Sequence, residues 1–349
     1  METITATPIT ELLPTTQNAS VTLPPLELLN GFIDNANIDT RSDSTKASYA
    51  ADVKAFEAWA TSAGLKTPQG RPVPTEWVAA WAESMKREGK APATIERRVR
   101  GLGSHHRANG YPDPTAFDLM TSFLGNVRRQ AGAQKQAHAL RSVDILKMAH
   151  KIDDDTLDGA RDKAMLLLGF ACALRVSELA KLNIEDIAIS DDRIAITIRD
   201  AKTAKSAAEV QHVVAACSPD VDLCPVESVR HWIDSAGIES GPVFRGMTRH
   251  NTIRSTAIST RAVGDIIKRA AKDAGVIGWA DVSSHSLRRG WTTEAATQGV
   301  PQAIIKQHGR WKTDATVANY IAEVGSVSAL AATRAVINGI SFAEAMTAE

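Results

Sequence analysis

The chain has 349 residues, of which 44% are hydrophobic and 23% are charged, and its formal net charge is zero. These proportions predict a soluble globular protein that is long enough to form two domains. The longest uninterrupted apolar run, Met165 to Leu174, is too short to cross a bilayer, so the sequence argues against a membrane protein. No Lys or Arg precedes Arg41, and we therefore expect no secretory signal.

The charge is unevenly distributed along the chain. Residues 1–40 hold five acidic residues and no basic one, whereas residues 41–320 carry a net charge of +7. An excess of this size is compatible with a nucleic-acid partner, but many proteins that never contact DNA have as much. The three cysteines show no CxxC spacing, so we expect reduced thiols, a cytoplasmic protein and no metal site.

The first third of the chain predicts a tail followed by a helical domain. Residues 1–41 are rich in Thr, Pro and Asn without periodicity, and we expect them to be disordered or weakly ordered. Apolar residues then recur at helical spacing, which predicts an all-helical domain at residues 42–132. Its four helices are expected to begin after Ser44, near Thr75, near Ala93 and at Asp118.

A small, polar segment at residues 133–141 predicts a linker, and residues 142–325 predict a second, α+β domain that is mainly helical. Helices are expected to resume at Val143. The alternation of isoleucines in Arg193–Asp200 predicts a strand, and a second strand is expected at Val210–Ala215. Further on, Ser259 is expected to cap a helix that Gly275 ends, and the Ser283-Ser284 pair is expected to start another.

Four motifs of this second domain contain residues that could bind or attack a phosphodiester. They are Arg175 with Glu178, Lys202 in the expected hairpin, His285 with Arg288, and Trp311 followed nine residues later by Tyr320. Each has an ordinary explanation when taken alone. Arg175 can pair with Glu178, a hairpin lysine is usually solvated, an H-x-x-R pattern is common by chance, and many tyrosines are core residues.

The order and spacing of all these positions together resemble the tyrosine recombinase (phage integrase) family, and the resemblance covers residues 42–325. Trp311, where most relatives have His, and Lys202-Thr203 make the pattern Cre-like. Arg310 departs from the family, because relatives often have Gly at this position. His308 lies near the expected site, but its distance of 12 residues from Tyr320 does not match the family spacing of nine.

The resemblance implies a SAM-like helical core-binding bundle and an α+β catalytic domain that form a C-shaped clamp around DNA. It implies that Tyr320 attacks the phosphodiester and forms a 3′-phosphotyrosine bond, with no metal or other cofactor. Arg175 and Arg288 would grip the phosphate, with further hydrogen bonds from His285 and Trp311. Lys202 would protonate the leaving 5′-oxygen, and Glu178 would orient Arg175 or His285.

The resemblance also implies partners. These are double-stranded DNA with inverted-repeat target sites and further copies of the chain, which would form a tetramer on two duplexes with the C-terminal segment 326–349 as protomer contact. The helical domain concentrates basic residues that we expect to contact DNA. They are Lys86, Arg87, Lys90, Arg97, Arg98, Arg100, His105, His106 and Arg107.

Three alternatives have to be weighed against a recombinase. A type IB topoisomerase or a telomere-resolving enzyme would use the same chemistry with a different outcome. A DNA-binding regulator without catalysis would not need the catalytic positions, all of which are filled. The separate helical domain and the C-terminal tail favour the recombinase.

Overall fold

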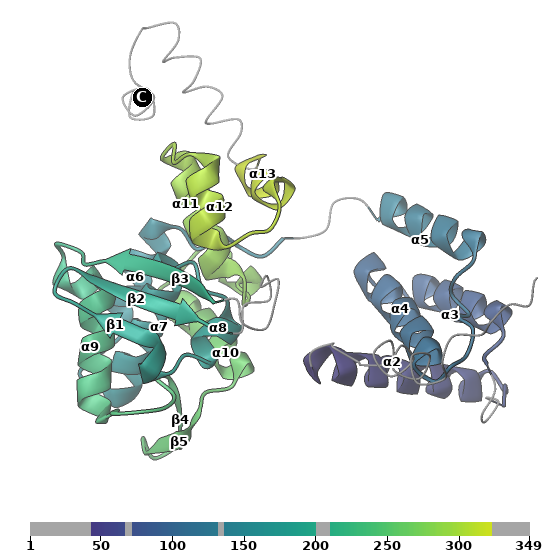
Figure 1. The fold of residues 1–349 in the computed structure, drawn as a ribbon, viewed down its shortest axis with the longest axis horizontal. Coiled ribbons are helices and arrows are strands. Elements are labelled where there is room, and N and C mark those ends of the chain that lie inside the picture. The colour runs from purple at the N-terminus through teal and green to yellow at the C-terminus, as the bar shows by residue number, and fades with distance from the viewer. Residues whose placement is uncertain (1–42, 67–71, 132–135, 200–209, 323–349) are drawn as a thin grey trace, which may run out of the picture. The chain divides into compact units, whose positions relative to one another are not determined.

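The computed structural model describes residues 43–66, 72–131, 136–199 and 210–322, coloured from purple to yellow in Figure 1. The chain divides into two compact units, Met1–Gln134 and Lys135–Glu349, which we call the N-terminal and C-terminal units. The expected tails and Lys202 lie outside the described residues. Within the described ranges, no helix is both long and apolar enough to cross a membrane.

In its described residues, the N-terminal unit is a bundle of four helices. They are α2 (Asp43–Ser62), α3 (Thr75–Arg87), α4 (Pro92–Ala108) and α5 (Asp118–Gln130). Each begins within about two residues of the position that the sequence predicts. Phe56 and Trp81 meet edge to face in the core, with ring centroids 5.2 Å apart, and Met85, Ile95 and Leu102 surround them. Gly89 and Gly110 follow α3 and α4 with positive φ, which lets the chain leave each helix without steric strain.

The C-terminal unit combines helices with two small antiparallel sheets. Its first half contains α6 (Ser142–Lys151), α7 (Leu157–Ala171), α8 (Val176–Ala180), η2 (Ile184–Asp186), β1 (Ile187–Ile189), β2 (Arg193–Ile198), β3 (Gln211–Ala216), η3 (Val221–Leu223) and α9 (Pro225–Ala236). Its second half contains β4 (Arg245–Met247), β5 (Ile253–Ala257), α10 (Thr260–Asp273), η4 (Trp279–Asp281), α11 (Ser286–Thr297), α12 (Gln302–Gly309) and α13 (Asp314–Ala322).

The larger sheet has the strand order β1-β2-β3, with α9 and α7 nearby in Figure 1. In β2, Ile194, Ile196 and Ile198 are buried and their neighbours are more exposed, so the alternation predicted from the sequence is confirmed. Ile196 pairs with Val213 of β3, and the apolar face contributes to one core with α7 and α9. Lys202 lies between β2 and β3 in the sequence, outside the described residues.

Helix α7 is the centre of the C-terminal unit. Thr156 caps it by accepting a hydrogen bond from the Gly159 amide (3.2 Å), and every residue from Gly159 to Gly169 is buried. The helix ends at Cys172, and Ala173 then adopts a left-handed conformation with φ of +45°. Because non-glycine residues rarely adopt this conformation, the sharp turn before Arg175 must be held by its surroundings.

Two predictions about helix starts have different outcomes. Ser259 caps α10 by accepting from the Ala262 amide (3.1 Å), as expected. Helix α11, however, begins at Ser286 and not at the serine pair, because the Ser283 amide donates to the Ser286 hydroxyl (2.9 Å). His285 therefore precedes the helix, whereas a helix that started at the serine pair would have placed it in the first turn; the predicted start is wrong.

The beginning of the C-terminal unit is tied to α11. The His138 amide donates to the Asp281 carbonyl (3.0 Å), and the Leu140 amide donates to the Ser286 carbonyl (3.2 Å). Gly290 lies so close to the Leu140 carbonyl that a Cβ built on it would be 1.7 Å from the oxygen. These contacts fix the position of the helix that carries Arg288.

Candidate active site

The first element of the candidate site is the Arg175–Glu178 pair at the start of α8. The Arg175 amide donates to Glu178 Oε2 (2.9 Å), and the Arg175 side chain forms an ion pair with Glu178 Oε1. The ordinary explanation of this motif, a local salt bridge, is therefore correct for these two residues. This salt bridge is compatible with a role in a functional site, because Arg288 and Arg310 lie beside the pair.

The second element is Arg288, in the first turn of α11 and 4% exposed. Its Nη1 donates to the Ala173 carbonyl (2.9 Å), and its Nη2 donates to the Gly309 carbonyl. The guanidinium carries five N–H groups, so bonds to two carbonyls are compatible with further bonds to phosphate oxygens. Its carbon lies 4.4 Å from the centre of the Trp311 ring, in cation–π geometry.

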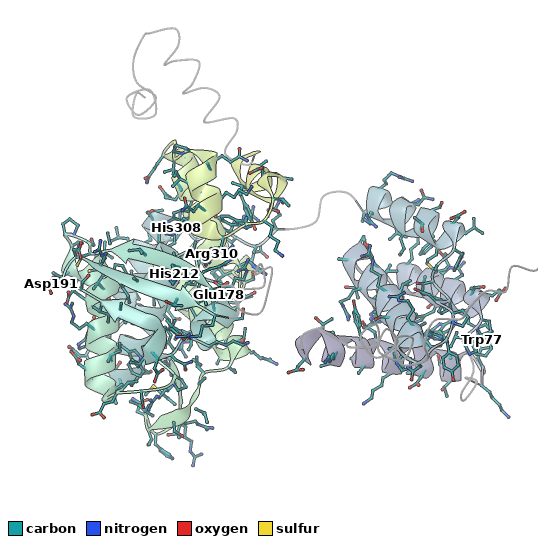
Figure 2. The ribbon with its side chains drawn as sticks, in the orientation of Figure 1. Trp77, Glu178, Asp191, His212, His308 and Arg310 are labelled. Atoms are coloured by element: carbon teal, nitrogen blue, oxygen red, sulfur yellow. The ribbon has the colours of Figure 1, made fainter. Side chains whose placement is uncertain are left out.

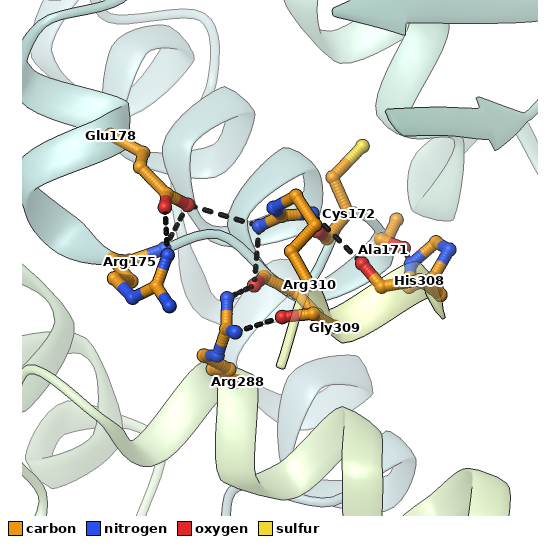
Figure 3. Close-up of polar contacts among 9 residues, drawn as sticks. Ala171, Cys172, Arg175, Glu178, Arg288, His308, Gly309 and Arg310 are labelled. Atoms are coloured by element: carbon orange, nitrogen blue, oxygen red, sulfur yellow. Dashed lines mark hydrogen bonds and ion pairs between the residues drawn. The ribbon is translucent and has the colours of Figure 1, made fainter. Parts of the chain in front are cut away.

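The third element is Arg310, which follows α12 directly and stands where relatives often have Gly. It is 6% exposed, and its Nη2 donates to Glu178 Oε2 (2.9 Å). Figure 3 shows Arg175, Glu178, Arg288 and Arg310 joined through carboxylate and backbone oxygens into one network. Segments far apart in the sequence, the α7–α8 turn, α11 and the end of α12, thus converge on one place.

This network holds more positive than negative charge. Burial opposes ionisation of Glu178, but Arg310 and Arg175 outweigh it, so the pKa of Glu178 lies below its ordinary value. Burial, together with Arg175 and Arg310, lowers the pKa of Arg288 to about 9. Arg288 is therefore cationic at neutral pH, and its guanidinium lies with those of Arg175 and Arg310 around one carboxylate. A fixed excess of positive charge in a buried setting stabilises an anion such as a phosphodiester.

Trp311 and Tyr320 lie next to the arginines. The Trp311 ring faces Arg288, and its centroid is 5.7 Å from that of the Tyr320 ring, which is partly exposed. Gly309 makes room for this arrangement, since a Cβ built on it would lie 1.6 Å from the Trp311 ring. A residue with a side chain at position 309 would therefore clash with the Trp311 ring, which explains the glycine two residues before this tryptophan. A phenol beside a buried cationic cluster is suited to attack a bound phosphodiester.

The two histidines near the site differ. The Nε2–H group of His308 donates to the Ala171 carbonyl (2.9 Å), and its ring stacks on Trp291 with centroids 4.0 Å apart. These contacts make it a packing residue, in agreement with its wrong spacing from Tyr320. Figure 2 shows His308 in the same part of the C-terminal unit as Glu178 and Arg310, away from Asp191. His285 is exposed at the start of α11, and Lys202 lies outside the described residues.

Comparison with known proteins decides the family. The model of the phage integrase family matches residues 138–324, more than half of the chain. The chain belongs to the phage integrase family.

Relatives and solved structures agree with this assignment. The "Integrase/recombinase xerD homolog" of Selenomonas ruminantium is 28% identical, over 82% of this chain and 84% of that protein. "Recombinase cre" of Escherichia phage P1 is 26% identical, over 77% and 82%. Among solved structures, XerH recombinase bound to palindromic difH substrate has a TM-score of 0.59 at 14% identity, covering 84% of this chain and 79% of that one. A lambda integrase dimer bound to a COC′ core site has a TM-score of 0.57 at 16% identity, covering 85% of this chain and 95% of that one.

The protein is thus a tyrosine recombinase, and the predictions of its family, enzyme class and mainly helical fold are confirmed. The roles of individual residues are a separate matter, because a shared fold does not assign them. For these roles, the contacts of this chain are the evidence.

Among the basic residues predicted to contact DNA, most are exposed on the N-terminal unit of this tyrosine recombinase, but many have carboxylate partners. The pairs are Arg87–Glu83 (3.0 Å), Lys90–Glu88 (3.6 Å), Arg97–Asp52 (2.5 Å), Arg100–Glu96 (2.5 Å) and Arg107–Asp113. Exposed pairs are weak, so such a side chain can exchange its carboxylate for a phosphate. Arg97 differs because Asp52 is only 2% exposed, which indicates a structural pair. Lys86 and His105 are exposed, and Arg98 is half-buried against Met85.

His106 does not belong to a DNA-binding surface, and this prediction is wrong. The residue is 4% exposed. Its Nε2 accepts from the Val73 amide (3.1 Å), and its Nδ1 lies 2.9 Å from the Leu102 carbonyl. Both ring nitrogens are therefore used inside the bundle. The run of basic residues in the sequence did not reveal that α4 turns this histidine toward the core.

Proposed function

We propose that this tyrosine recombinase exchanges DNA strands at specific sites through a 3′-phosphotyrosine intermediate formed by Tyr320. The observation that carries the proposal is the network of Arg175, Glu178, Arg288 and Arg310, which lies beside Trp311 and Tyr320. A buried cluster with excess positive charge can bind the scissile phosphate. The adjacent phenol can then attack the phosphorus in line.

In the proposed reaction, the Tyr320 oxygen forms a bond to phosphorus and the bond to the 5′-oxygen breaks. The phosphoryl group gains negative charge in the transition state, and Arg175 and Arg288 stabilise it. His285 accepts the phenol proton, and Lys202 delivers a proton to the leaving 5′-oxygen. The phosphotyrosine bond conserves the energy of the broken bond, so the reverse attack by a 5′-hydroxyl rejoins a strand without a nucleotide cofactor.

Glu178 and Trp311 support this chemistry. Glu178 keeps Arg175 in place through its two bonds to that residue. The indole N–H of Trp311 serves as a further donor to the phosphate, and its ring stacks on Arg288. The proposal includes no metal: in the described part of the chain, no three His, Cys, Asp or Glu side chains form a cluster that could hold one.

We also propose which partners this recombinase binds and in which compartment of the cell it acts. Solved neighbours include recombinases bound to DNA and a lambda integrase tetramer bound to a Holliday junction (TM-score 0.54, 16% identity). By analogy, the protein binds duplex DNA with inverted-repeat sites, forms a tetramer on two duplexes and exchanges strands through a Holliday junction. It does so in the cytoplasm, where the DNA of bacteria and their phages is found.

The nucleophile is tested by trapping the covalent adduct. Bound sequences are first selected from a random DNA pool, and a nicked version of the selected site is then incubated with protein in EDTA without ATP. SDS should reveal a protein–DNA adduct with the wild type. Tyr320→Phe should bind the site and give no adduct, whereas the matched control Tyr111→Phe should react normally. If peptide mapping finds the DNA attached to a residue other than Tyr320, the assignment is wrong. A second assay measures whether two sites are joined to each other, which a recombinase does and a topoisomerase that relaxes DNA does not.

A further inference from the structure

Arg310 has a backbone conformation that its side chain must stabilise. It ends α12 with φ of +55° and ψ of +45°, in the left-handed region. Glycine adopts this conformation without cost, but an L residue with a side chain does not. An arginine here therefore needs compensating contacts, and its burial shows that it makes them within the protein.

The side chain of Arg310 contacts three parts of the site. Its Nη1 donates to the carbonyls of Cys172 (3.1 Å) and His308 (2.9 Å). Its Nη2 donates to the carbonyl of Ala173 (3.1 Å) and to Glu178 Oε2 (2.9 Å). The guanidinium thus holds the end of α7 and the carboxylate of α8 at the same time.

Two of these contacts, to Glu178 and to the Ala173 carbonyl, lead to the arginines that bind phosphate in the proposed function. Glu178 is the partner of Arg175, so a displaced carboxylate would release the Arg175 side chain. The Ala173 carbonyl also accepts from Arg288 Nη1 (2.9 Å), so the same oxygen serves both arginines. Ala173 itself is in a left-handed conformation, and two charged donors on its carbonyl hold that turn in place.

We propose that Arg310 is a positioning residue that sets the geometry of both Arg175 and Arg288, through Glu178 and the Ala173 carbonyl. This inference rests on the proposed function. Arg310 itself does not bind the phosphate, because its two Nη atoms make four bonds to protein oxygens and so use all four of their N–H groups. Arg288 makes only two such bonds and keeps free N–H groups for a phosphate. The contribution of Arg310 is to the alignment of the groups that bind the phosphate.

The test compares Arg310→Gly with the wild type. Glycine removes the side chain and relieves the backbone strain, which favours a folded variant. Adduct formation on the nicked site should slow by about 10²-fold, the usual cost of a misplaced catalytic group. The dissociation constant for DNA should stay close to that of the wild type. Arg310→Lys should be intermediate, because an ammonium can pair with Glu178 but cannot reach the carbonyls with two separate nitrogens.

The pH dependence of the cleavage rate distinguishes a positioning role of Arg310 from a general loss of stability in Arg310→Gly. Three cations surround Glu178: Arg175 at the start of its own helix, Arg310 after α12 and Arg288 in α11. His308, at the end of α12, is a nearby titratable group. Without Arg310, burial of the carboxylate is less well offset, so Glu178 should take up a proton at a higher pH. The ratio of variant to wild-type cleavage rates should therefore fall under mildly acidic conditions. In the double variant Arg310→Gly/Glu178→Gln, this extra pH dependence should vanish.

Two controls complete the experiment. Asn251→Gly relieves the same left-handed conformation (φ of +57°) in the β4–β5 turn and should leave the cleavage rate unchanged. Thermal unfolding of every variant gives a temperature at which all are folded. If Arg310→Gly cleaves at the wild-type rate at that temperature, with an unchanged pH profile, the inference is wrong. If the wild type itself forms no adduct, the proposed function fails, and this outcome is distinct from the first.

Discussion

The Glu178 carboxylate receives charged donors from two sides. Arg175 and Arg310 bind its two oxygens, and only 6% of its side chain is exposed. Removing one partner of a buried ion pair usually costs more than the pair contributes, because the remaining charge is left unpaired. Glu178 is therefore as important for stability as for the alignment of Arg175.

The first prediction concerns Glu178 and pH. Its pKa is lower in the folded protein than the ordinary 4.5, because the cations outweigh the effect of burial. The stabilisation is therefore fully present above pH 4.5 and is lost as the pH falls through the lower, folded value. Glu178→Gln should lower the free energy of unfolding at neutral pH by about 3–5 kcal/mol. Urea unfolding at a series of pH values should show a smaller difference between variant and wild type in acid.

An unchanged difference between the two proteins down to strongly acidic pH would show that Glu178 does not contribute through its charge. Glu185 is a suitable control, because its carboxylate is exposed and accepts from the Gly241 amide (2.9 Å). Glu185→Gln should change the free energy of unfolding little.

At the scale of single residues, the sequence predicts which positions belong to the site but not how they connect. Order and spacing identify Arg175, Glu178 and Arg288, because the chemistry of a phosphodiester restricts the residue types. The role of Arg310 could not be predicted, because the contact to Glu178 joins residues 132 positions apart. One sequence signal was present: an arginine where relatives often have glycine.

At the scale of elements, α11 connects the start of the C-terminal unit to the site. Its first turn carries Arg288, and Gly290 on the same helix touches the Leu140 backbone. Arg141 adds an ion pair to Glu294 (2.9 Å), one turn further along. The segment before α6 thus supports the helix that carries Arg288.

The second prediction compares two helical glycines. Gly290→Ala places a Cβ against the Leu140 carbonyl, so α11 must shift, and overpacking of this kind costs about 1–3 kcal/mol. Adduct formation should slow as well, since Arg288 moves with the helix. Gly264→Ala in α10 has no atom within 4 Å of the new Cβ. It should stabilise the protein by about 0.5–1 kcal/mol, because alanine favours a helix over glycine.

Thermal unfolding and adduct formation, measured together, check this pair of variants. Equal effects of the two substitutions on stability would contradict the packing of α11 against Leu140. The comparison controls for the intrinsic helix propensity, which changes in the same direction at both positions.

The elements themselves were largely predictable from local signals. The isoleucine alternation of β2, the caps of α7 and α10 and the apolar spacing in α2 to α5 each act within a few residues. The start of α11 was misplaced for an equally local reason. Ser283 and Ser284 look like caps, but the Ser286 hydroxyl accepts from the Ser283 amide and so tightens the turn before the helix.

At the scale of the whole molecule, each unit has its own core. Phe56, Trp81 and Leu102 belong to the core of the N-terminal unit, whereas Leu168 and Trp232 belong to that of the C-terminal unit. Family resemblance predicted two domains from motifs and helical spacing. Composition alone did not point to a DNA partner, because a net charge of zero conceals the positive middle of the chain.

The third prediction concerns residues 326–349, which lie outside the described residues. Leu330, Ile337 and Phe342 make this segment more apolar than a free tail, and we expect it to contact a neighbouring protomer. A chain that ends at Gly325 should bind a single half-site nearly as well as the full chain but should assemble less cooperatively on two. Gel-shift titrations on one and two half-sites measure this difference, and equal cooperativity would refute the expected contact.

The hydrogen bonds at the α7–α8 turn have a consequence for the order of folding. Arg288 and Arg310 reach the Ala173 and Cys172 carbonyls across 115 to 138 residues of chain. Contacts between such distant residues form late, because a large loop must close before they contribute any energy. On the ribosome, the segment with Arg175 emerges long before its partners. A nascent chain, or one that terminates before Arg310, therefore lacks the contacts that assemble the candidate site.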